Sequence, residues 1–141
     1  MKISAKTQYG LAAMIYIAAR EDGSPITVLQ VSEQLDISKI YLEQVFSLLK
    51  RAGLVQSVKG AQGGYRLARP AEDISAYDIL NALDTALLEE AAPALRSCRA
   101  QGIQAAVQNL VLTPLGEGLQ KFLQGISLLQ LCEAGINSST V

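Results

Sequence analysis

The hydrophobic positions between residues 38 and 51 follow the period of an α-helix. The four that form a single buried stripe, at i, i+3, i+4 and i+7, are Leu42, Val45, Phe46 and Leu49. Ser38 precedes them and is a good N-cap, because its hydroxyl can accept a hydrogen bond from a free amide of the first turn. Gly53 follows, where a residue of positive φ often ends a helix. The pattern predicts a helix from Ser38 to Arg51 with one apolar and one polar face.

A shorter helix is predicted immediately before this one. Thr27 is followed by Gln30 three residues later, which is the spacing of a capping box. The positions expected to face inward are Val28, Val31 and Leu35. Residues 36–37 are left for a turn into Ser38. Two helices joined by so short a turn are typical of a helix-turn-helix, although a helical hairpin without DNA contacts has the same pattern.

The residues after the second helix predict a two-stranded hairpin. Residues 54–58 and 65–67 alternate apolar and polar side chains, and residues 60–64 between them contain three glycines. Glycine permits positive φ and leaves room for close approach to a phosphate backbone. Lys59 and Arg66 add positive charge on the two sides of the loop. A glycine-rich hairpin alone is usually only a turn, but directly after a helix-turn-helix it is typical of a DNA-binding wing.

The polar face of the second helix is the candidate surface for reading DNA. Its first turns offer donors and acceptors suited to base edges and phosphates, and Ile40 suits contact with a thymine methyl. An ordinary amphipathic surface helix has the same pattern. Lys59 is expected to reach a minor groove or a phosphate, or else to be a solvated loop lysine. The candidate DNA-binding residues are Ser38, Lys39, Ile40, Tyr41, Glu43, Gln44, Lys50, Lys59, Gly63, Gly64 and Arg66.

Two further helices are predicted around this motif. Ser4 can cap a helix extending to about Arg20, and Ser75 with Asp78 can cap another extending to about Leu88. The inner positions are expected to be Leu11, Met14, Ile15 and Ala18 in the first, and Ile79, Leu80 and Leu83 in the second. The residues at the start of the first helix that could either meet phosphate or only brace the core are Lys2, Lys6, Thr7, Gln8 and Tyr9.

A second apolar pattern occupies the C-terminal part of the chain. From Ile103 onward, hydrophobic residues recur at helical spacing, at Val107, Leu110, Val111, Leu115, Leu119, Phe122, Leu123 and Ile126. Thr113-Pro114 interrupts the pattern, because a proline either starts a new helix or kinks a longer one. A small winged domain cannot easily bury this stripe, so we expect a homodimer interface. Packing against its own domain is the alternative.

Composition and charge agree with a DNA-binding protein. Half of the 141 residues are hydrophobic, which is enough for one core. The absence of a membrane-length apolar run and of a signal-peptide pattern predicts a cytoplasmic protein without a membrane partner. Residues 1–70 contain nine Lys or Arg and five Asp or Glu, whereas residues 71–141 contain three and eight. A basic part that contains the motif and an acidic part that lacks it are typical of a DNA-binding protein with a separate oligomerisation region. The absence of histidine and of a GxxxxGK[ST] loop argues against an enzyme.

These segments resemble the Rrf-two family of bacterial transcription regulators, which includes the IscR-like and NsrR-like repressors. The resemblance rests on SAKTQYGLAAM, on ISKIYLEQVFSLLKRAGLVQSVKGAQGGYRLARP and on ISAYDILNAL, and it covers about residues 1–88 closely. It implies a dimeric winged-helix regulator that binds a double-stranded DNA operator with two half-sites. It also implies that Tyr41, Glu43 and Gln44 lie on the recognition helix and that Lys59 lies on the wing.

One departure from the family concerns its iron–sulfur cluster. Cluster-bearing relatives carry three cysteines in the segment that here reads EEAAPALRSCRAQGIQ, which holds only Cys98. Such clusters usually have about four ligands, mostly thiolates. The chain offers one other cysteine, Cys132, and no histidine, so we expect no cluster, metal or other cofactor. Cys132 is expected in the core. Cys98, between Arg96 and Arg99, is either a redox-sensing thiol or an incidental loop cysteine.

Together the patterns predict a mainly α-helical protein with a small β wing. We expect a winged helix-turn-helix domain at residues 1–88, an irregular segment at 89–103, a helical dimerisation region at 104–135 and a tail at 136–141. The predicted function is sequence-specific transcriptional regulation by a homodimer. Its signal, whether a thiol modification, a small metabolite or a protein partner, stays open. A winged-helix module that binds another protein and reads no DNA is the competing interpretation.

Overall fold

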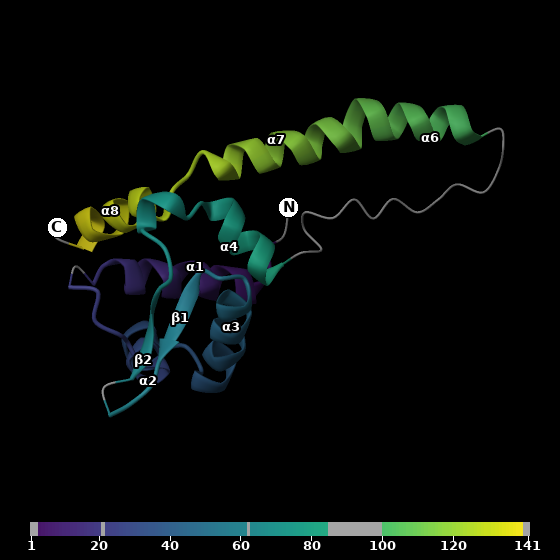
Figure 1. Cartoon of the computed structure of the whole chain (residues 1–141). Helices are drawn as coiled ribbons and strands as arrows, with labels where there is room; N and C mark the ends of the chain where they lie inside the picture. The colour runs from purple at the N-terminus through teal and green to yellow at the C-terminus, as the bar shows by residue number, and fades with distance from the viewer. Residues whose placement is uncertain (1–2, 21, 62, 85–99, 140–141) are drawn as a thin grey trace.

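The computed structural model describes residues 3–20, 22–61, 63–84 and 100–139, and side chains only up to residue 135 in the last of these ranges. Its winged domain consists of α1 (Ala5–Ala18), α2 (Val28–Leu35), α3 (Lys39–Arg51), β1 (Val55–Val58), β2 (Gly64–Leu67), the 3₁₀ turn η1 (Ala71–Asp73) and α4 (Ala76–Leu83). The C-terminal part consists of α6 (Gln101–Val107), the π-helical segment η3 (Gln108–Leu112), α7 (Thr113–Gln124) and α8 (Leu128–Ser139). The predicted fold class, mainly α with a small β wing, is confirmed (Figure 1). Within the described residues, no helix combines the length and the hydropathy needed to cross a bilayer.

Helices α2 and α3 form the helix-turn-helix that their caps predict. The Thr27 hydroxyl accepts a hydrogen bond from the Gln30 amide at 3.1 Å, and the Gln30 side chain accepts one from the Thr27 amide at 2.9 Å. Asp36 makes the turn in the left-handed region at φ 54°, which a short polar residue tolerates. Ser38 caps α3 through a long hydrogen bond, 3.5 Å, from the Tyr41 amide. The four predicted stripe residues of α3 are fully buried, which confirms its inner face.

The wing is joined to the helices at its base. Strands β1 and β2 pair in antiparallel fashion, as the hairpin pattern predicts. Ile26 and Tyr65 exchange two backbone hydrogen bonds of 2.8 Å, so Ile26 adds a one-residue bridge to the sheet. The Tyr65 ring also stacks on Phe46 of α3, with 4.7 Å between ring centroids. The sequence patterns did not predict the bridge at Ile26, which ties the wing to the segment before α2.

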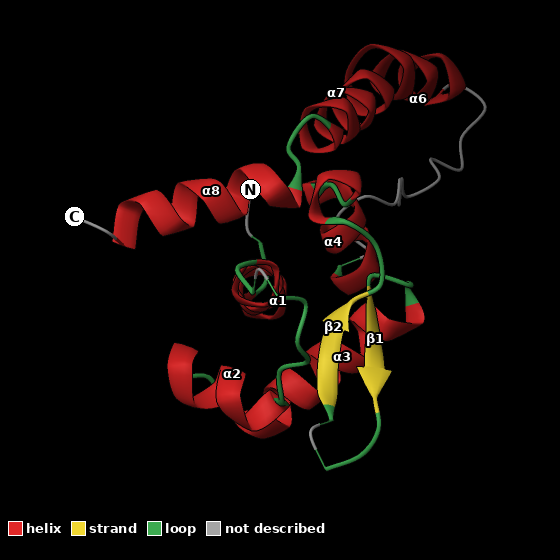
Figure 2. Ribbon diagram, turned by 60° about the vertical axis from the view of Figure 1, so that its left-hand side comes forward, coloured by secondary structure: helices red, strands yellow, loops and turns green. Residues whose placement is uncertain are grey.

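Helix α1 is the central element of the domain, and its buried face differs from the predicted one. Met14 is fully buried, but Leu11, Ile15 and Ala18 are only partly buried. The buried positions of α1 are Thr7, Gly10, Ala13, Met14 and Ile17. The prediction of a single stripe is wrong in part because α1 contacts α3, α4 and α8 on different sides. Figure 2, which looks along α1, shows these helices around it.

Helix α4 begins where the sequence predicts and ends earlier. Ser75 and Asp78 form a capping box with hydrogen bonds of 2.9 and 3.1 Å. Its predicted inner positions, Ile79, Leu80 and Leu83, are buried. The helix ends at Leu83 instead of about Leu88, because Asp84 leaves the helical region with φ −142°. Residues 85–99, which include most of the expected irregular segment, lie outside the described part of the chain.

The segments α6, η3 and α7 form one continuous helical rod that extends away from the winged domain (Figure 1). The backbone keeps right-handed helical angles at both joints. Pro114 has no amide proton, and the π-helical turn before it is a common way to accommodate a missing hydrogen bond. Thr113-Pro114 therefore lies inside a longer helix. The rod starts at Gln101, so the last residues of the expected irregular segment, 101–103, are helical.

Backbone hydrogen bonds join the connection between α7 and α8 to the residues at the start of α4. The Ala76 amide donates to the Ile126 carbonyl at 2.8 Å, and the Leu128 amide donates to the Ile74 carbonyl at 2.7 Å. Helix α8 then packs against α1. Cys132 of α8 is buried, as the sequence predicts. The direction of the rod relative to the helix-turn-helix is therefore set by main-chain contacts as well as by apolar packing.

Candidate nucleic-acid interface

The outer face of α3 is the exposed surface of the helix-turn-helix. At about 100° per residue, this face lies on the side of the helix opposite its buried stripe. The exposed residues of α3 are Lys39, Ile40, Glu43, Gln44, Ser47, Lys50 and Arg51. Lys39 and Glu43 form an i,i+4 ion pair at 4.0 Å, and both side chains are more than half exposed. Such a pair contributes little to stability, so both charges are available to an external partner.

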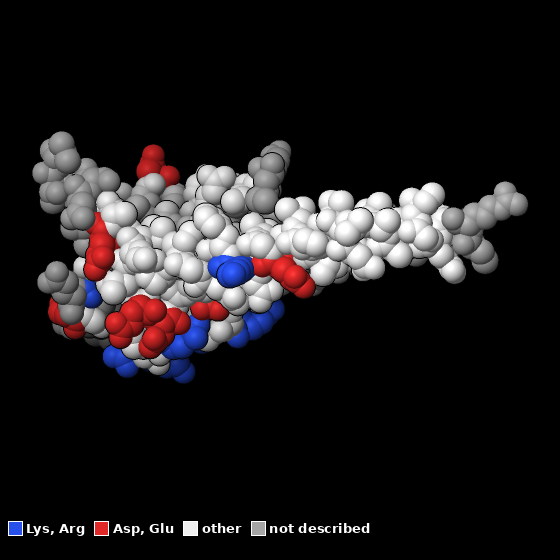
Figure 3. Space-filling view, turned by 90° about the horizontal axis from the view of Figure 1, so that it is seen from above, with Lys and Arg blue, Asp and Glu red and all other residues white. Residues whose placement is uncertain are grey.

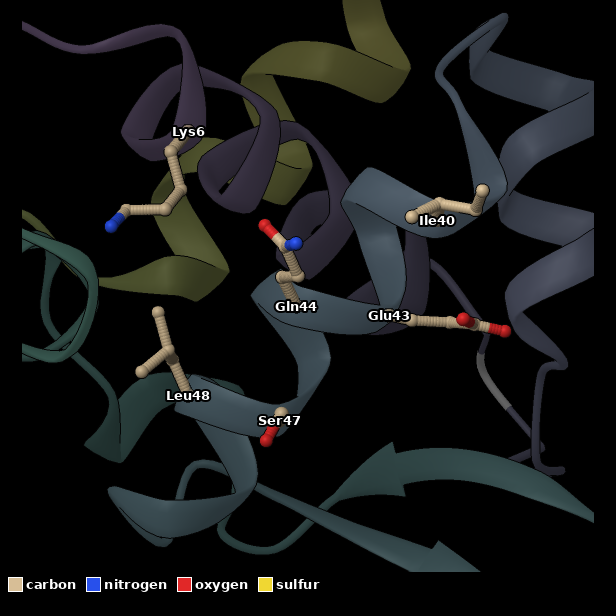
Figure 4. Close-up of a pocket in the computed structure, with 6 residues that line it drawn as sticks. All are labelled: Lys6, Ile40, Glu43, Gln44, Ser47 and Leu48. Carbon is tan, nitrogen blue, oxygen red and sulfur yellow. The ribbon is translucent and has the colours of Figure 1, made fainter.

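An open hollow lies between this face and the start of α1. It is lined by Lys6, Ile40, Glu43, Gln44, Ser47 and Leu48. Figure 4 shows Gln44 and Leu48 on the side of α3 that faces Lys6, while Glu43 points away from them. A cation, an amide, a carboxylate and a hydroxyl beside apolar side chains suit a surface that meets base edges and phosphates. The sequence patterns did not place Leu48 in this group, although it follows Gln44 by one helical turn.

Tyr41 differs from the other candidate residues of α3 because it is half-buried. The ring of Tyr9, from the first turns of α1, meets the Tyr41 ring edge to face with centroids 5.3 Å apart. This contact joins the beginnings of α1 and α3. Thr7, which was also expected to be able to meet phosphate, is fully buried and shares a 3.0 Å hydrogen bond with the Ser4 hydroxyl. Of the two alternatives for Thr7, its burial supports the one in which it only braces the core.

The wing presents its two predicted cations to solvent. Lys59 begins the loop and Arg66 lies on β2, where its cross-strand partner is Gln56 of β1. The side chains of these residues are exposed. Tyr65 and Leu67, which flank Arg66 on β2, pack against the core. Alternation along the strand thus directs Arg66 outward, and both cations are accessible to a phosphate backbone.

Two predicted DNA-binding residues, Gly63 and Gly64, have a role within the wing itself. Gly64 has φ +149°, and a Cβ added there would lie 2.5 Å from the Ile26 carbonyl oxygen. A Cβ on Gly63 would lie 2.5 Å from the Val58 carbonyl oxygen. These close approaches explain the glycines without any external partner. Contact between either glycine and DNA stays a prediction.

Lys50 lies at the other end of α3 from the first-turn candidates. It follows Lys39 by eleven residues, which is roughly 16 Å along a helix axis. With Arg51 it forms a basic last turn, where positive charge is favoured by the helix dipole. Lys50 therefore has a local explanation in addition to the predicted DNA contact. Cys98, the candidate redox thiol, lies outside the described residues.

Two helices joined by a left-handed turn and followed by a two-stranded wing define a winged helix-turn-helix protein, a class whose second helix enters the major groove. Residues 3–134 match the Rrf2 family, described as iron-dependent transcriptional regulators, and the chain belongs to this family. The resemblance that the sequence motifs indicate is confirmed. The prediction that the protein is a transcriptional regulator and not an enzyme is confirmed with it.

Several known proteins are similar to this chain over most of its length. The HTH-type transcriptional regulator IscR of Vibrio atlanticus is 35% identical over 131 residues, which cover 93% of this chain and 75% of the relative. The structure of CymR (YrzC), described as the global cysteine regulator of B. subtilis, matches with a TM-score of 0.76 and 29% identity, covering 95% of this chain and 98% of that one. The structure of T. potens IscR matches with a TM-score of 0.72 and 32% identity, covering 96% and 88%.

The cysteine and histidine content of this chain does not match the usual ligand set of an iron–sulfur cluster. The sequence contains two cysteines and no histidine. Cys132 is 4% exposed in α8. Among the described residues, no group of three or more His, Cys, Asp or Glu is arranged to hold a metal ion. Because iron–sulfur clusters usually take about four ligands, mostly thiolates, one copy of this chain cannot supply such a set.

Proposed function

We propose that this protein is a sequence-specific DNA-binding regulator that acts as a homodimer in the cytoplasm. The observation that carries the proposal is the outer face of α3, whose side chains are exposed opposite a fully buried stripe. An amide such as Gln44 pairs with adenine, and a carboxylate such as Glu43 accepts a hydrogen bond from cytosine. Lys39, Lys59 and Arg66 are exposed cations suited to phosphates.

The rod supplies the dimer interface in this proposal. Its C-terminal end packs on its own domain, where Leu123 is buried and Leu119 and Ile126 are partly buried against α4. The rest of the predicted stripe is 45% to 76% exposed and consists of Ile103, Val107, Leu110, Val111, Leu115 and Phe122. Figure 3 shows a rod surface that is almost without charged side chains. An apolar stripe of this length marks an interaction site, and a second copy presents the same stripe across a two-fold axis.

A two-fold dimer accounts for an operator with two half-sites. Recognition helices related by two-fold symmetry enter successive major grooves when they are about 34 to 36 Å apart. The hydrogen bonds of Ala76 and Leu128 hold the connection that follows the rod against the winged domain of the same subunit. Any signal that alters this junction would alter the distance between the two recognition helices. The effector is therefore expected to act on the rod, on its junction with α4, or on the segment between α4 and α6.

We also propose that the regulator works without an iron–sulfur cluster. Two cysteines and no histidine support this part of the proposal. Protein purified under anaerobic conditions is expected to be colourless and to contain neither iron nor sulfide in stoichiometric amounts. Visible absorbance together with about one or more irons per subunit would contradict it, and would require thiolates shared between subunits.

The experiment that tests the proposed function is selection of bound fragments from random duplex DNA by the full-length chain. The expected result is a palindromic consensus whose half-site centres are separated by about one helical turn or a multiple of it. Affinity for the consensus should exceed affinity for a scrambled duplex by a factor on the order of 10³ or more. Recovery of unrelated fragments, all bound as weakly as scrambled DNA, would contradict the proposal.

A further inference from the structure

Ile40 is an apolar residue on the otherwise polar outer face of α3, and hydrogen bonding to DNA does not explain its presence there. It is 72% exposed, whereas Leu29 and Tyr9, the other exposed large hydrophobic residues in the described part of the winged domain, are 51% and 38% exposed. Among the side chains that the structure describes, the remaining large exposed apolar ones belong to the rod and to α8. Figures 1 and 2 show α4 between α3 and the rod, so the proposed dimer interface lies away from α3.

The position of Ile40 on α3 points its side chain directly away from the core. At about 100° per residue, Ile40 lies within roughly 10° of the direction opposite the centre of the buried stripe. Ser47 and Gln44 lie within roughly 40° of it on the two sides. Ile40 is also the second residue of the helix after the Ser38 cap. Because side chains tilt toward the helix N-terminus, it projects from the end that reaches base edges in helix-turn-helix proteins.

The chemistry of Ile40 restricts what it can recognise in a major groove. The Lys39–Glu43 ion pair and the Gln44 amide beside it can exchange hydrogen bonds with base edges or phosphates. A branched hydrocarbon side chain can exchange none, and it gains only by leaving water together with another apolar group. The apolar group that unmodified DNA exposes in the major groove is the C5 methyl of thymine. A cytosine methylated at C5 exposes the same group.

We propose that Ile40 is a specificity-determining residue that recognises a C5 methyl group of a pyrimidine in each half-site. The proposal rests on the proposed DNA-binding function and assigns one base-edge partner within it. Contact between Ile40 and the methyl group removes apolar surface of both from water. Gln44 or Glu43 then reads a hydrogen-bonding edge next to that pyrimidine, since both residues line the same hollow as Ile40.

The test uses the full-length chain and the palindromic duplex obtained by selection. Each thymine is replaced, at both symmetry-related positions together, by deoxyuridine, which lacks only the methyl group. Affinities of the wild type and of Ile40→Ala are measured by fluorescence anisotropy at fixed salt. At one position, the affinity of the wild type for the duplex is expected to fall about fourfold per methyl group removed, or about 15-fold when both half-sites are changed. The affinity of Ile40→Ala is expected to fall less than about twofold at that position, because the side chain that contacts the methyl group is already absent in this variant.

A second scan distinguishes the two sources of the methyl group. Each cytosine is replaced by 5-methylcytosine in the same symmetric manner. A gain in affinity for the wild type that is absent for Ile40→Ala supports the proposal with methylated cytosine as the source. The proposal is overturned if neither scan finds a position coupled to Ile40. It is also overturned if the loss on deoxyuridine substitution is equal for the wild type and Ile40→Ala, because another residue then reads that methyl.

Two controls separate recognition from folding and from the broader function. Gln120→Ala changes an exposed position of α7, outside the outer face of α3, and is expected to keep the full effect of deoxyuridine substitution. Ile40→Ala should keep the circular dichroism spectrum and melting temperature of the wild type. For Ile40→Val, the loss of affinity on deoxyuridine substitution should lie between that of the wild type and that of Ile40→Ala. Failure of the proposed function would appear as no preference for the selected duplex at all. Failure of this inference leaves that preference intact and only removes the coupling to Ile40.

Discussion

Tyr9 of α1 meets Tyr41 of α3 edge to face, with ring centroids 5.3 Å apart and an interplanar angle of 84°. This is a favourable geometry for an aromatic pair, because the positive edge of one ring approaches the negative face of the other. Tyr41 is half-buried in this contact, whereas Lys39 and Ile40 before it are exposed. The structure therefore gives α1 a role in holding the Tyr41 side chain of α3 in place.

Replacing Tyr9 should weaken DNA binding through the orientation of Tyr41. Tyr9→Ala removes an aromatic contact worth about 0.5–1.5 kcal/mol, so we expect an affinity loss of several-fold for the selected duplex. Tyr9→Phe keeps the ring and should bind within about twofold of the wild type. Anisotropy titrations of the three proteins provide the measurement. Equal losses for Tyr9→Phe and Tyr9→Ala would show that the hydroxyl, and not the ring contact, is important.

Lys59 on the wing should contribute to binding mainly through phosphate charge. Lys59→Ala is expected to weaken binding to selected and scrambled duplexes by similar factors. The slope of log K against log salt should become less steep by about 1.8, because each of two subunits loses one phosphate contact. Lys121→Ala, which removes an exposed lysine of α7, is the matched control and should leave the slope unchanged. An unchanged slope for Lys59→Ala would show that the wing lysine does not meet phosphate.

A charge placed in the apolar stripe of the rod should break the homodimer. Leu110 is 76% exposed in a single chain, so Leu110→Glu should not disturb the fold of the subunit. In the dimer the added carboxylate would face its own symmetry mate in apolar surroundings, which is strongly unfavourable. Light scattering after size exclusion should give a dimer for the wild type and a monomer for Leu110→Glu. Gln120→Glu, an exposed α7 position with the same charge change, should stay dimeric. A monomeric wild type at micromolar concentration would contradict the proposed interface.

The two glycines at the ends of the wing loop should differ sharply in tolerance to alanine. Both have positive φ, +116° at Gly60 and +149° at Gly64. A Cβ at Gly60 meets nothing within 4 Å, so Gly60→Ala should cost about 1–3 kcal/mol of stability from backbone strain alone. Gly64→Ala adds a collision with the Ile26 backbone and should cost more than that. Urea unfolding at equal protein concentration tests the difference. Equal losses would indicate that the backbone at Ile26 moves to admit the methyl group.

The caps and the periodic stripes could be predicted from sequence because they depend on local spacing. Thr27, Ser38 and Ser75 cap the helices that they were expected to cap, and the inner stripe of α3 is buried in full. The buried face of α1 could not be predicted. Its sequence is apolar on several sides, since it packs against α2, α3, α4 and α8, so periodicity alone does not distinguish Leu11 from Ala13.

Other features depend on contacts between segments that are distant in the chain. The bridge between Ile26 and Tyr65 joins residues 39 positions apart, and no local pattern indicates it. The apolar repeat continues past Leu83, so periodicity did not reveal that α4 ends there. Pro114 is compatible with both a helix start and a helix interior, and only the surrounding backbone decides between them. Within the site, the exposure of α3 could be predicted, but the Tyr9–Tyr41 contact depends on how α1 crosses α3.

The claim on which the account depends is that the outer face of α3 reads base edges. The most direct measurement is the ratio of affinities for the selected and scrambled duplexes, determined at one salt concentration for the wild type and for the double variant Glu43→Ala/Gln44→Ala. We predict that the variant keeps its melting temperature and its affinity for scrambled DNA, while its ratio falls at least about tenfold below that of the wild type, because hydrogen bonds to bases are lost in both half-sites. A folded variant whose ratio equals that of the wild type would contradict the account.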